Sequence, residues 1–382
     1  MGIQYCHSFN DFRQLAKKRL PAPLFHYIDG GAEDEWTLKR NTEAFEQVAL
    51  VPNALADLTG LDISTTVLGR KLSMPLFCAP TGMTRLFHPE GELAVARAAS
   101  QLETYYSLST LSTVSIEAIG QATTGPKMFQ LYIHKDRSLT TEFIERCKAA
   151  HFDALCLTVD TLVTGNRERD KRTGLIMPPQ LTAQSLLSFA LHPLWAWNYL
   201  KGEKFELANL STRLARSEQD LVSVMSYVTE QFDRGVVWRD AEAIIAQWGK
   251  PFAIKGIMSV ADAKRAVEIG ASAIMLSNHG GRQLEGCAAP FDVLPKIADA
   301  VGGQIEIIVD GGIRRGTHVL KALAMGATAC SMGRSYLFPL AAGGQAGVER
   351  ALGLLKAEIE RNMILMGCQS LKDLDRDKVM RL

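Results

Sequence analysis

The sequence predicts a closed (β/α)₈ barrel, because short apolar runs alternate with helical segments along most of its 382 residues. Eight of these runs have the length and composition of buried strands. They span residues 76–80, 105–109, 128–133, 154–160, 252–256, 273–276, 305–309 and 329–332. Strands at this spacing pair in parallel, and eight such units favour a barrel over an open sheet. An open doubly wound sheet usually carries Gly-x-Gly-x-x-Gly after an early strand, and the sequence lacks this motif.

Helical patterns occupy the intervals between the strands. They are predicted at residues 10–20, 89–102, 115–122, 139–150, 259–269 and 345–366. Ser115 and the pair Ser259 and Asp262 have the composition of helix N-caps, as do Asp136 and Ser138. An internal similarity supports the repeated unit, since residues 266–276 and 322–332 each read as a helix end, a glycine cap and a buried strand.

The chain is expected to form one domain over residues 1–382, with a helical lead-in, a barrel at about 74–366 and a long insertion at about 174–235. The insertion follows the fourth strand, where about 90 residues separate Asp160 from Phe252. Its residues 181–200 are apolar, are divided by Pro193 and include Trp195, Trp197 and Tyr199. Such a segment suits a membrane surface, while a lid or a contact between subunits would use the same composition.

The bulk properties exclude several classes of protein. A net charge of +1 gives no support for nucleic-acid binding. The seven cysteines are scattered, so neither a disulfide framework nor a metal site is expected, and a reducing cytoplasm fits. The N-terminus lacks the pattern of a signal peptide, and no uninterrupted apolar run is long enough to span a membrane.

Polar residues stand where the predicted strands end, which is where barrel enzymes carry their active sites. After residues 273–276 comes Ser277-Asn-His-Gly-Gly-Arg-Gln-Leu-Glu, in which His279 is a candidate base and Arg282 a candidate anion ligand. Alone, this motif is equally compatible with an ordinary turn. Lys255 lies on an apolar strand and must meet an anion, in a site or in a structural ion pair.

The last two strands are each followed by glycine and arginine. Asp310-Gly-Gly-Ile-Arg-Arg-Gly and Gly333-Arg334 resemble the loops that hold phosphate after the seventh and eighth strands of many barrels. Glycine lets backbone N–H groups approach a phosphate, and Arg314 and Arg334 would add charge. The alternative is a pair of ordinary turns with surface arginines.

These motifs together resemble the FMN-dependent enzymes that oxidise L-2-hydroxy acids, a family that includes glycolate oxidase, flavocytochrome b2, lactate oxidase and bacterial lactate and mandelate dehydrogenases. The resemblance covers nearly the whole chain. Besides residues 277–283, it includes residues 25–35, 79–82, 108–110, 129–132, 157–160, 165–168, 254–256, 310–314 and 333–334.

The resemblance implies catalytic roles for three residues. His279 would be the base, Asp160 would stabilise the imidazolium, and Tyr132 would hydrogen-bond the substrate oxygen. Arg167 and Arg282 would bind the substrate carboxylate, for which a planar guanidinium is suited, and Tyr27 would add a hydroxyl group.

The resemblance also implies a set of residues that hold FMN. Lys255 would face the part of the flavin that gains negative charge on reduction. Others would hold the ring, and those near residues 310–334 would hold the ribityl phosphate. The full set is Pro80, Thr81, Gly82, Ser109, Gln130, Thr158, Lys255, Ser277, Asp310, Gly312, Arg314, Gly333 and Arg334.

Within the family, the chain resembles most the bacterial membrane-associated L-lactate and mandelate dehydrogenases. The resemblance implies oxidation of L-lactate to pyruvate, with electrons passed to quinone or another respiratory acceptor. It further implies a homotetramer in the cytoplasm, attached to the inner face of the cell membrane through residues 181–200. Gly82 favours an acceptor other than oxygen, and Leu111 and Thr164 suggest a pocket for acids larger than glycolate.

Three alternatives remain at this point. An oxidase that produces hydrogen peroxide, or a mandelate-type dehydrogenase, would use the same motifs. A barrel that only binds a partner would not reduce a flavin. A phosphosugar isomerase or aldolase would share the phosphate loops but would not explain His279, Arg282 and Lys255 together.

Overall fold

The computed structural model describes residues 2–175, 180–203, 205–210 and 233–382, and its centre is a closed barrel of eight parallel strands. The barrel closes where β11 pairs with β4, with Cys330 opposite Leu76. This confirms the predicted fold class. The strands are β4 (Leu76–Thr81), β5 (Tyr106–Ser109), β6 (Lys127–Leu131), β7 (Ala154–Thr158), β8 (Phe252–Ile257), β9 (Ala273–Ser277), β10 (Glu306–Asp310) and β11 (Ala329–Met332).

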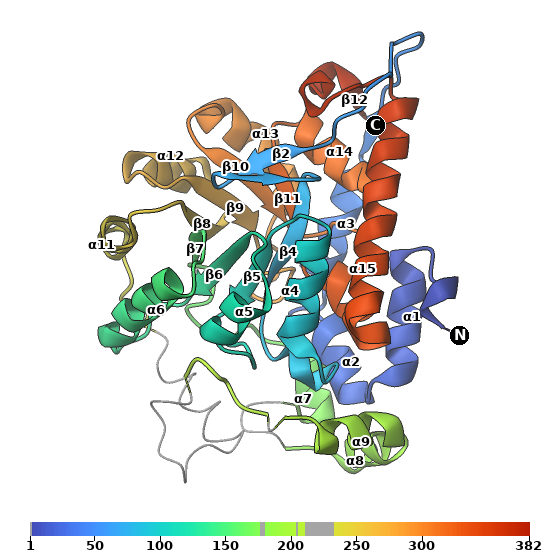
Figure 1. The fold of residues 1–382 in the computed structure, drawn as a ribbon, viewed down its shortest axis with the longest axis vertical. Coiled ribbons are helices and arrows are strands. Elements are labelled where there is room, and N and C mark those ends of the chain that lie inside the picture. The colour runs from blue at the N-terminus through green and yellow to red at the C-terminus, as the bar shows by residue number, and fades with distance from the viewer. Residues whose placement is uncertain (1, 176–179, 204, 211–232) are drawn as a thin grey trace.

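Helices surround the barrel, as Figure 1 shows. Ser115, Asp136 and Ser259 accept N-cap hydrogen bonds, as the sequence predicts. The helices between and after the strands are α4 (Gly91–Gln101), α5 (Ile116–Ala122), α6 (Arg137–Ala149), α11 (Trp238–Trp248), α12 (Val260–Glu268), α13 (Pro290–Val301), α14 (Gly316–Ala324) and α15 (Arg334–Leu365).

The last helix begins earlier than predicted. The sequence places its start at residue 345, whereas α15 begins at Arg334 and continues past a kink at Gly343 and Gly344. These two glycines have non-helical backbone angles and hide the first half of the helix from a pattern search. The early start sets the α15 N-terminus directly after β11, at the carboxyl-end rim of the barrel.

The N-terminal lead-in is helical and lies beside the last helix. It comprises η1 (Ile3–Tyr5), α1 (Phe9–Arg19), α2 (Ala22–Asp29) and α3 (Trp36–Glu46). Ser8 caps α1, and Pro21 separates it from α2. Figure 1 shows α1 alongside α15, and the end of α2 brings Tyr27 and Ile28 to the barrel mouth.

Two small antiparallel pairs complete the fold and were not predicted. β1 (Val48–Leu50) pairs with β12 (Val379–Arg381), which follows η5 (Leu371–Asp373) and η6 (Arg376–Lys378). β2 (Thr65–Val67) pairs with β3 (Arg70–Leu72), and their apolar side chains join those that fill the barrel interior. The short helix η2 (Thr84–Leu86) follows β4.

The described part of the insertion contains α7 (Glu168–Thr173), α8 (Ala183–Ala190) and α9 (Pro193–Lys201). Pro193 starts α9, so the predicted division of residues 181–200 is correct. In Figure 1, α8 and α9 lie at one end of the molecule, beyond α7. Lys204 and parts of the predicted 174–235 insertion lie outside the described residues.

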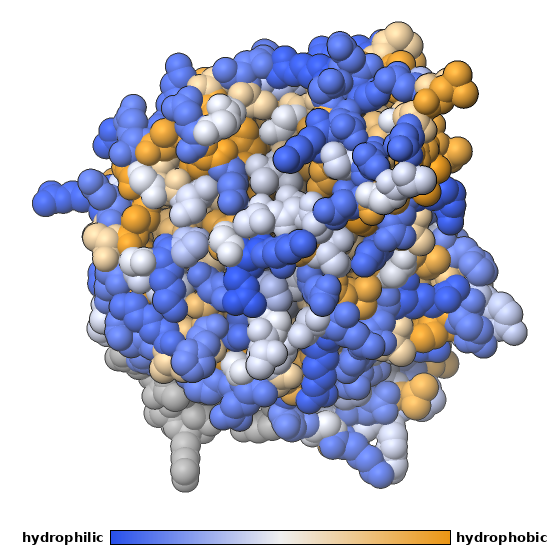
Figure 2. Space-filling model, turned by 45° about the horizontal axis from the view of Figure 1, so that its top comes forward, coloured by the Kyte–Doolittle hydropathy of each residue, from blue (hydrophilic) through white to orange (hydrophobic). Residues whose placement is uncertain are grey.

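The surface is mostly polar. On the face drawn in Figure 2, polar side chains predominate and apolar groups form small scattered patches. Isolated apolar side chains of this kind are usual on soluble domains and need no special explanation. Two places differ from this pattern. Charged and polar side chains line a cavity at the mouth of the barrel, and large apolar side chains are exposed on the outer side of α8 and α9.

Candidate active site

A cavity of about 650 Å³ opens at the carboxyl ends of the barrel strands. Its walls include the residues that the sequence predicts for cofactor and substrate, except Asp160 and Ser277, which lie behind the wall and hydrogen-bond its members. Leu111 and Thr164 also line it. The predicted residues on its wall are Tyr27, Pro80, Thr81, Gly82, Ser109, Gln130, Tyr132, Thr158, Arg167, Lys255, His279, Arg282, Asp310, Gly312, Arg314, Gly333 and Arg334.

His279 enters the cavity from a tight turn after β9. His279, Gly280 and Gly281 have φ angles of 57°, 68° and 72°, all in the left-handed region. A Cβ at Gly281 would lie 2.5 Å from the backbone nitrogen of Leu38, so no larger residue fits without a shift of the backbone. The turn therefore depends on the Gly-Gly pair, and a strained histidine is typical of functional sites.

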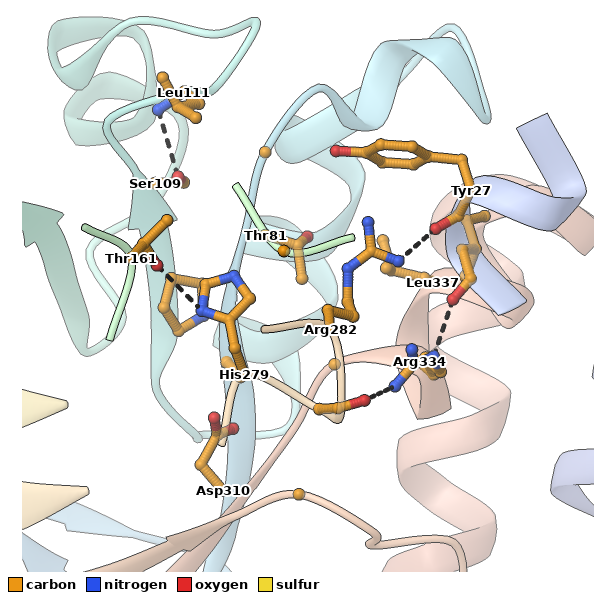
Figure 3. Close-up of a pocket in the computed structure, with 18 of the residues that line it drawn as sticks. Tyr27, Thr81, Ser109, Leu111, Thr161, His279, Arg282, Asp310, Arg334 and Leu337 are labelled. Carbon is orange, nitrogen blue, oxygen red and sulfur yellow. Dashed lines mark hydrogen bonds between the residues drawn. The ribbon is translucent and has the colours of Figure 1, made fainter. Parts of the chain in front are cut away.

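The imidazole of His279 is oriented by a carboxylate. Its Nδ1 lies 3.0 Å from Asp160 Oδ1 and 3.3 Å from Thr161 Oγ1. A neutral imidazole in this position carries its proton on Nδ1, which leaves Nε2 as the acceptor. Figure 3 shows the ring of His279 beside Thr161, facing the cavity.

Burial lowers the pKa of His279, although the negative charge of Asp160 acts in the opposite direction. Burial acts to raise the pKa of Asp160, but the charges of His279 and Lys255 outweigh it and the pKa lies below its usual value. At neutral pH the pair therefore consists of a neutral base and an ionised carboxylate. A neutral base beside an anion can take up a proton and is then stabilised as the cation.

Lys255 is almost fully buried and forms an ion pair with Asp310. Its Nζ lies 2.8 Å from Asp310 Oδ2 and donates to Ser277 Oγ, also at 2.8 Å. Asp310 additionally accepts from Ser277 and Ser331. Burial acts to lower the pKa of Lys255, but the charges of Asp310 and Asp160 outweigh it, so the pKa is raised and the ammonium stays charged. Asp310 thus fixes a permanent cation on the cavity wall.

Arg282 and Arg167 both lie close to the Tyr27 ring. The guanidinium carbon of Arg282 is 4.7 Å from the ring centroid, and that of Arg167 is 5.9 Å away. Arg282 donates to the carbonyl oxygen of Tyr27, as Figure 3 shows, and makes no ion pair within the described chain. Burial and the charge of Arg167 lower the pKa of Arg282 to about 10. Two cations with only Asp170 nearby favour binding of an anion, and the Nε atom of Arg167 is buried with no partner among the described residues.

The loops after β10 and β11 contribute glycines and arginines to the same cavity. Gly312 has a φ of 75°, and a Cβ there would lie 1.8 Å from the carbonyl oxygen of Asn41. Gly333 is the N-cap of α15, whose N-terminus favours anions. Arg314 lies here with a pKa lowered to about 10 by burial. Arg334 donates to three backbone carbonyls of Ile28, Gly30 and Gly280, which leaves two of its five N–H groups for a ligand.

The remaining wall consists of polar strand ends. Ser109 donates to Gln130 at 2.9 Å, and Thr81 shares a 2.6 Å hydrogen bond with Tyr336. Within the described chain, the Nε2 atom of Gln130 and the Oγ1 atom of Thr158 are buried without a partner. Unsatisfied buried polar atoms are rare in proteins, so these two indicate that a polar group of a ligand completes the wall.

Gly82 has a packing role on the same wall. A Cβ there would lie 2.8 Å from the carbonyl oxygen of Leu111, so even alanine requires the loop to shift. Met83 donates to the same carbonyl at 2.9 Å, which ties the loops after β4 and β5 together. Gly82 therefore sets how closely the Leu111 loop approaches the cavity.

Several lining residues were not singled out from the sequence. Thr161 contacts His279, Asp170 lies beside Arg167, and Ser331 supports Asp310. Phe87 and Met83 add apolar surface. Thr161 and Ser331 directly follow or end predicted strands, so the rule that strand ends carry the site could have found them. Asp170 lies in the short helix α7 and Phe87 in the turn after η2, and neither segment is long enough to give a periodic signal in the sequence.

The geometry groups three chemical capacities around one cavity. A base with a bound carboxylate faces it from β9, two arginines and a tyrosine are placed to hold a small anion, and a buried lysine and an anion-binding helix terminus lie on other walls. Proton transfer to His279 from a small molecule that carries a carboxylate is therefore feasible beside a larger phosphate-bearing molecule.

Comparison with known proteins gives the family and its relatives. Residues 16–381 match the model of the FMN-dependent dehydrogenase family. The chain is 41% identical to L-lactate dehydrogenase of Alcaligenes faecalis over 98% of each chain. It is 43% identical to L-lactate oxidase of Nostoc over 96% of this chain and 95% of the relative. For glycolate oxidase of Spinacia oleracea the values are 39%, 97% and 94%.

Solved structures of related enzymes also resemble this chain. A monotopic membrane protein, (S)-mandelate dehydrogenase, superimposes with a TM-score of 0.94 at 34% identity, over 99% of this chain and 100% of that one. A mandelate oxidase bound to (S)-4-hydroxymandelic acid gives a TM-score of 0.84 at 37% identity, over 98% and 99%.

Proposed function

Because the chain belongs to the FMN-dependent dehydrogenase family, it is an oxidoreductase that uses FMN to oxidise a 2-hydroxy acid, and we propose that L-lactate is its substrate and pyruvate its product. The observation that carries the proposal is the pair of arginines at Tyr27, which faces the same cavity as the His279–Asp160 pair. A small hydroxy acid offers a carboxylate to the first pair, and the second pair can take the proton that the acid loses on oxidation.

The residues of the cavity fit FMN. The unpartnered atoms of Gln130 and Thr158 suit the polar edge of the isoalloxazine ring, together with Pro80, Thr81, Gly82 and Ser109. Lys255 would be held toward the ring by Ser277 and Asp310. The N-terminus of α15 suits the phosphate; the residues that would hold it are Gly312, Arg314, Gly333 and Arg334. FMN, when bound there, accepts the two electrons that the substrate loses.

Each residue near the substrate would have one task. Arg282 and Arg167 would bind the carboxylate, and the hydroxyl of Tyr27 would add a hydrogen bond. Tyr132, whose pKa burial raises to about 12, stays protonated and would donate to the substrate oxygen. His279 would take a proton at Nε2, and Asp160 would stabilise the resulting imidazolium.

Leu111 and Thr164 bear on the size of the acid. Both line the cavity, and neither is a bulky aromatic residue that would restrict the pocket to glycolate. We therefore expect L-lactate and longer L-2-hydroxy acids to be oxidised with higher kcat/KM than glycolate. Relative kcat/KM values across such a series test this, and a strong preference for glycolate would contradict it. Similarity to (S)-mandelate dehydrogenase makes an aromatic hydroxy acid the second candidate.

The electron acceptor is proposed to be quinone or another respiratory component. Relatives include both dehydrogenases and oxidases, so family membership leaves the choice between a quinone and oxygen open. Gly82 and the apolar insertion helices favour the quinone. Comparison of oxygen uptake with dye reduction distinguishes the two, since an oxidase would consume oxygen at a rate close to that of dye reduction.

The acid limb of the pH profile tests the His279–Asp160 pair. His279 must be neutral to act as a base, so kcat/KM should rise with pH through the pKa of His279, which burial places below its ordinary value. In Asp160→Asn the negative charge that raises this pKa is removed, so the limb should move to lower pH while the plateau falls, because the imidazolium loses its partner. Steady-state rates from pH 4.5 to 8 measure both changes. A limb that moves to higher pH would contradict the assignment.

We further propose that α8 and α9 attach the protein to the inner face of the cell membrane. No helix among the described residues has the length and apolar composition to cross a membrane. The two helices instead expose large apolar side chains outward, as an interfacial element does. These side chains are Leu186, Leu187, Leu191, Leu194, Trp197 and Leu200, each more than half exposed.

One predicted interface residue lies differently. Trp195 packs inward and donates its indole N–H to the carbonyl oxygen of Leu86 at 2.8 Å, so it anchors α9 to the barrel. Tyr199 stacks on it with ring centroids 5.1 Å apart, which leaves Trp197 as the most outward aromatic. Trp195 therefore holds the apolar face in place and does not itself form that face.

Charge on this face should release the protein from membranes. Leu187→Glu with Leu191→Glu is expected to move most of the protein to the soluble fraction, because burying two carboxylates at an interface is costly. Fractionation of cell lysates measures the distribution. Leu365→Glu, at an equally exposed leucine on α15, is the matched control and should have no effect. Unchanged fractionation of the double variant would contradict membrane attachment.

A homotetramer is also proposed, and light scattering of the purified protein tests it.

A further inference from the structure

A second cavity of about 260 Å³ lies between α9 and the barrel. One wall comes from the segment after β4 and includes Arg85, Phe87 and His88. The facing wall comes from the insertion and includes Trp195 and Asn198. The contact of Trp195 with the carbonyl oxygen of Leu86 holds these two walls together, so the cavity is a built feature of the fold.

The two cavities share one side chain. Phe87 is buried and lines both the large cavity at the barrel mouth and this smaller one. Its ring stacks on that of Tyr27, with centroids 6.3 Å apart. A molecule in the small cavity would therefore be separated from the contents of the large one by a single layer of side chains.

The small cavity also reaches the apolar outer side of α8 and α9. Leu191 and Leu194 line it, and each is 69% exposed. They belong to the face that would contact the membrane. An apolar chain can thus pass from the cavity into lipid without crossing a polar surface.

The inner wall suits a neutral ligand with hydrogen-bond acceptors. The Nε atom of Arg85 is buried and has no partner among the described residues, while its terminal nitrogen pairs with Glu203. Burial lowers the pKa of His88, although the negative charge of Glu90 acts in the opposite direction, so the imidazole is neutral at neutral pH. Trp195 and Phe87 provide flat aromatic surface.

The charge on this wall is a poor match for a phosphate group. Arg85 already has a carboxylate partner, and the other cations on the wall, Lys18 and Arg19, are exposed and screened by water. A lipid headgroup would need cations without carboxylate partners. A carbonyl oxygen needs one neutral or charged donor and an apolar surround, which Arg85 Nε and the aromatic rings supply.

We propose that this cavity binds the ring of a lipophilic quinone, whose tail leaves between Leu191 and Leu194. The proposal rests on the proposed function, since it assigns the place of the electron acceptor. The 2-hydroxy acid loses two electrons and two protons to become the 2-oxo acid, and the quinone gains two of each to become the quinol. Phe87 and Tyr27 form the barrier that keeps the acid and the quinone apart.

A matched pair of tryptophan substitutions tests the cavity. Asn198→Trp places an indole in the cavity, whereas Leu200→Trp places the same group outward on the same helix, at a leucine that is 78% exposed. The binding of a benzoquinone with a decyl tail to the FMN-loaded enzyme is measured by calorimetry in detergent. We expect Asn198→Trp to weaken binding at least tenfold and Leu200→Trp to leave it unchanged.

Two further measurements distinguish a failure of the cavity assignment from a failure of the proposed function. Anaerobic bleaching of the bound flavin by the hydroxy acid is expected to persist in Asn198→Trp, and this reaction reports the proposed function without the quinone. Equal quinone binding in all three proteins would overturn the cavity assignment even if bleaching persists. Loss of binding to vesicles of anionic phospholipid, with quinone binding intact, would identify a lipid headgroup site and would also overturn it.

Discussion

Replacement of His279 with glutamine is expected to lower kcat for L-lactate by about 10³-fold. The amide keeps the approximate size of the imidazole but cannot accept a proton and become a cation beside Asp160. The loss should appear in the reduction of the flavin by the hydroxy acid, followed by rapid mixing without oxygen. Binding of FMN should be retained, because the substitution leaves Lys255, Arg314 and Arg334 unchanged on the cavity wall.

The control for this variant is His7→Gln, an exposed histidine in the N-terminal segment, which should keep the wild-type rate. If His279→Gln reduces the flavin within tenfold of the wild-type rate, another group removes the proton. In that case the contact of His279 with Asp160 and Thr161 would serve the structure of the turn alone.

Replacement of Arg282 with methionine should weaken carboxylate binding by about 10²-fold, which corresponds to about 2.7 kcal/mol. Methionine keeps the apolar contact with the Tyr27 ring but removes the cation and its planar donors. Arg167 remains close to the same ring, so some affinity is retained. The change in the flavin absorption spectrum on titration with pyruvate gives the dissociation constant for the oxidised enzyme.

Two comparisons sharpen this experiment. Arg282→Lys keeps the charge and should lie between the wild type and methionine, because the planar match to a carboxylate is lost. Arg265→Met removes an arginine that is half exposed and paired with Glu268, and it should have no effect on pyruvate. An unchanged dissociation constant in Arg282→Met would show that the carboxylate is bound elsewhere.

The barrel could be predicted because parallel strands leave a strong pattern. β9 and β10 are nearly continuous apolar runs followed by polar residues, which is the signature of strands buried on both faces. The same reasoning placed Lys255, His279 and Asp310 at one end of the barrel, where the structure brings them together. The barrel topology brings these residues together, although they are far apart in the sequence.

The features that escaped prediction depend on long-range contacts or on irregular backbone. β1 and β12 pair across almost the whole chain, and each is only three residues long, so neither has a periodic signal. The kink at Gly343 and Gly344 concealed the start of α15. In the site, no sequence pattern indicates that Arg334 donates to three backbone carbonyls, or that Phe87 lies between two cavities.

The contacts of the Asp310 carboxylate could also be identified only from the structure. The resemblance to the FMN-dependent enzymes implies that Asp310 contacts the cofactor near its ribityl phosphate. The structure shows its carboxylate occupied by Lys255, Ser277 and Ser331, so its direct effect is to hold the ammonium charged and in place. A buried pair of this kind is visible only when both partners are placed in space.

Anaerobic bleaching of the bound flavin by the two enantiomers of lactate tests the central claim most directly. The purified FMN-loaded protein is mixed with L-lactate or D-lactate, and the loss of its yellow absorption is followed. We predict rapid bleaching by L-lactate and none by D-lactate on the same time scale, with bleaching by L-lactate slowed about 10³-fold in His279→Gln. A flavin that stays oxidised with L-lactate and with every other L-2-hydroxy acid would contradict the proposed function.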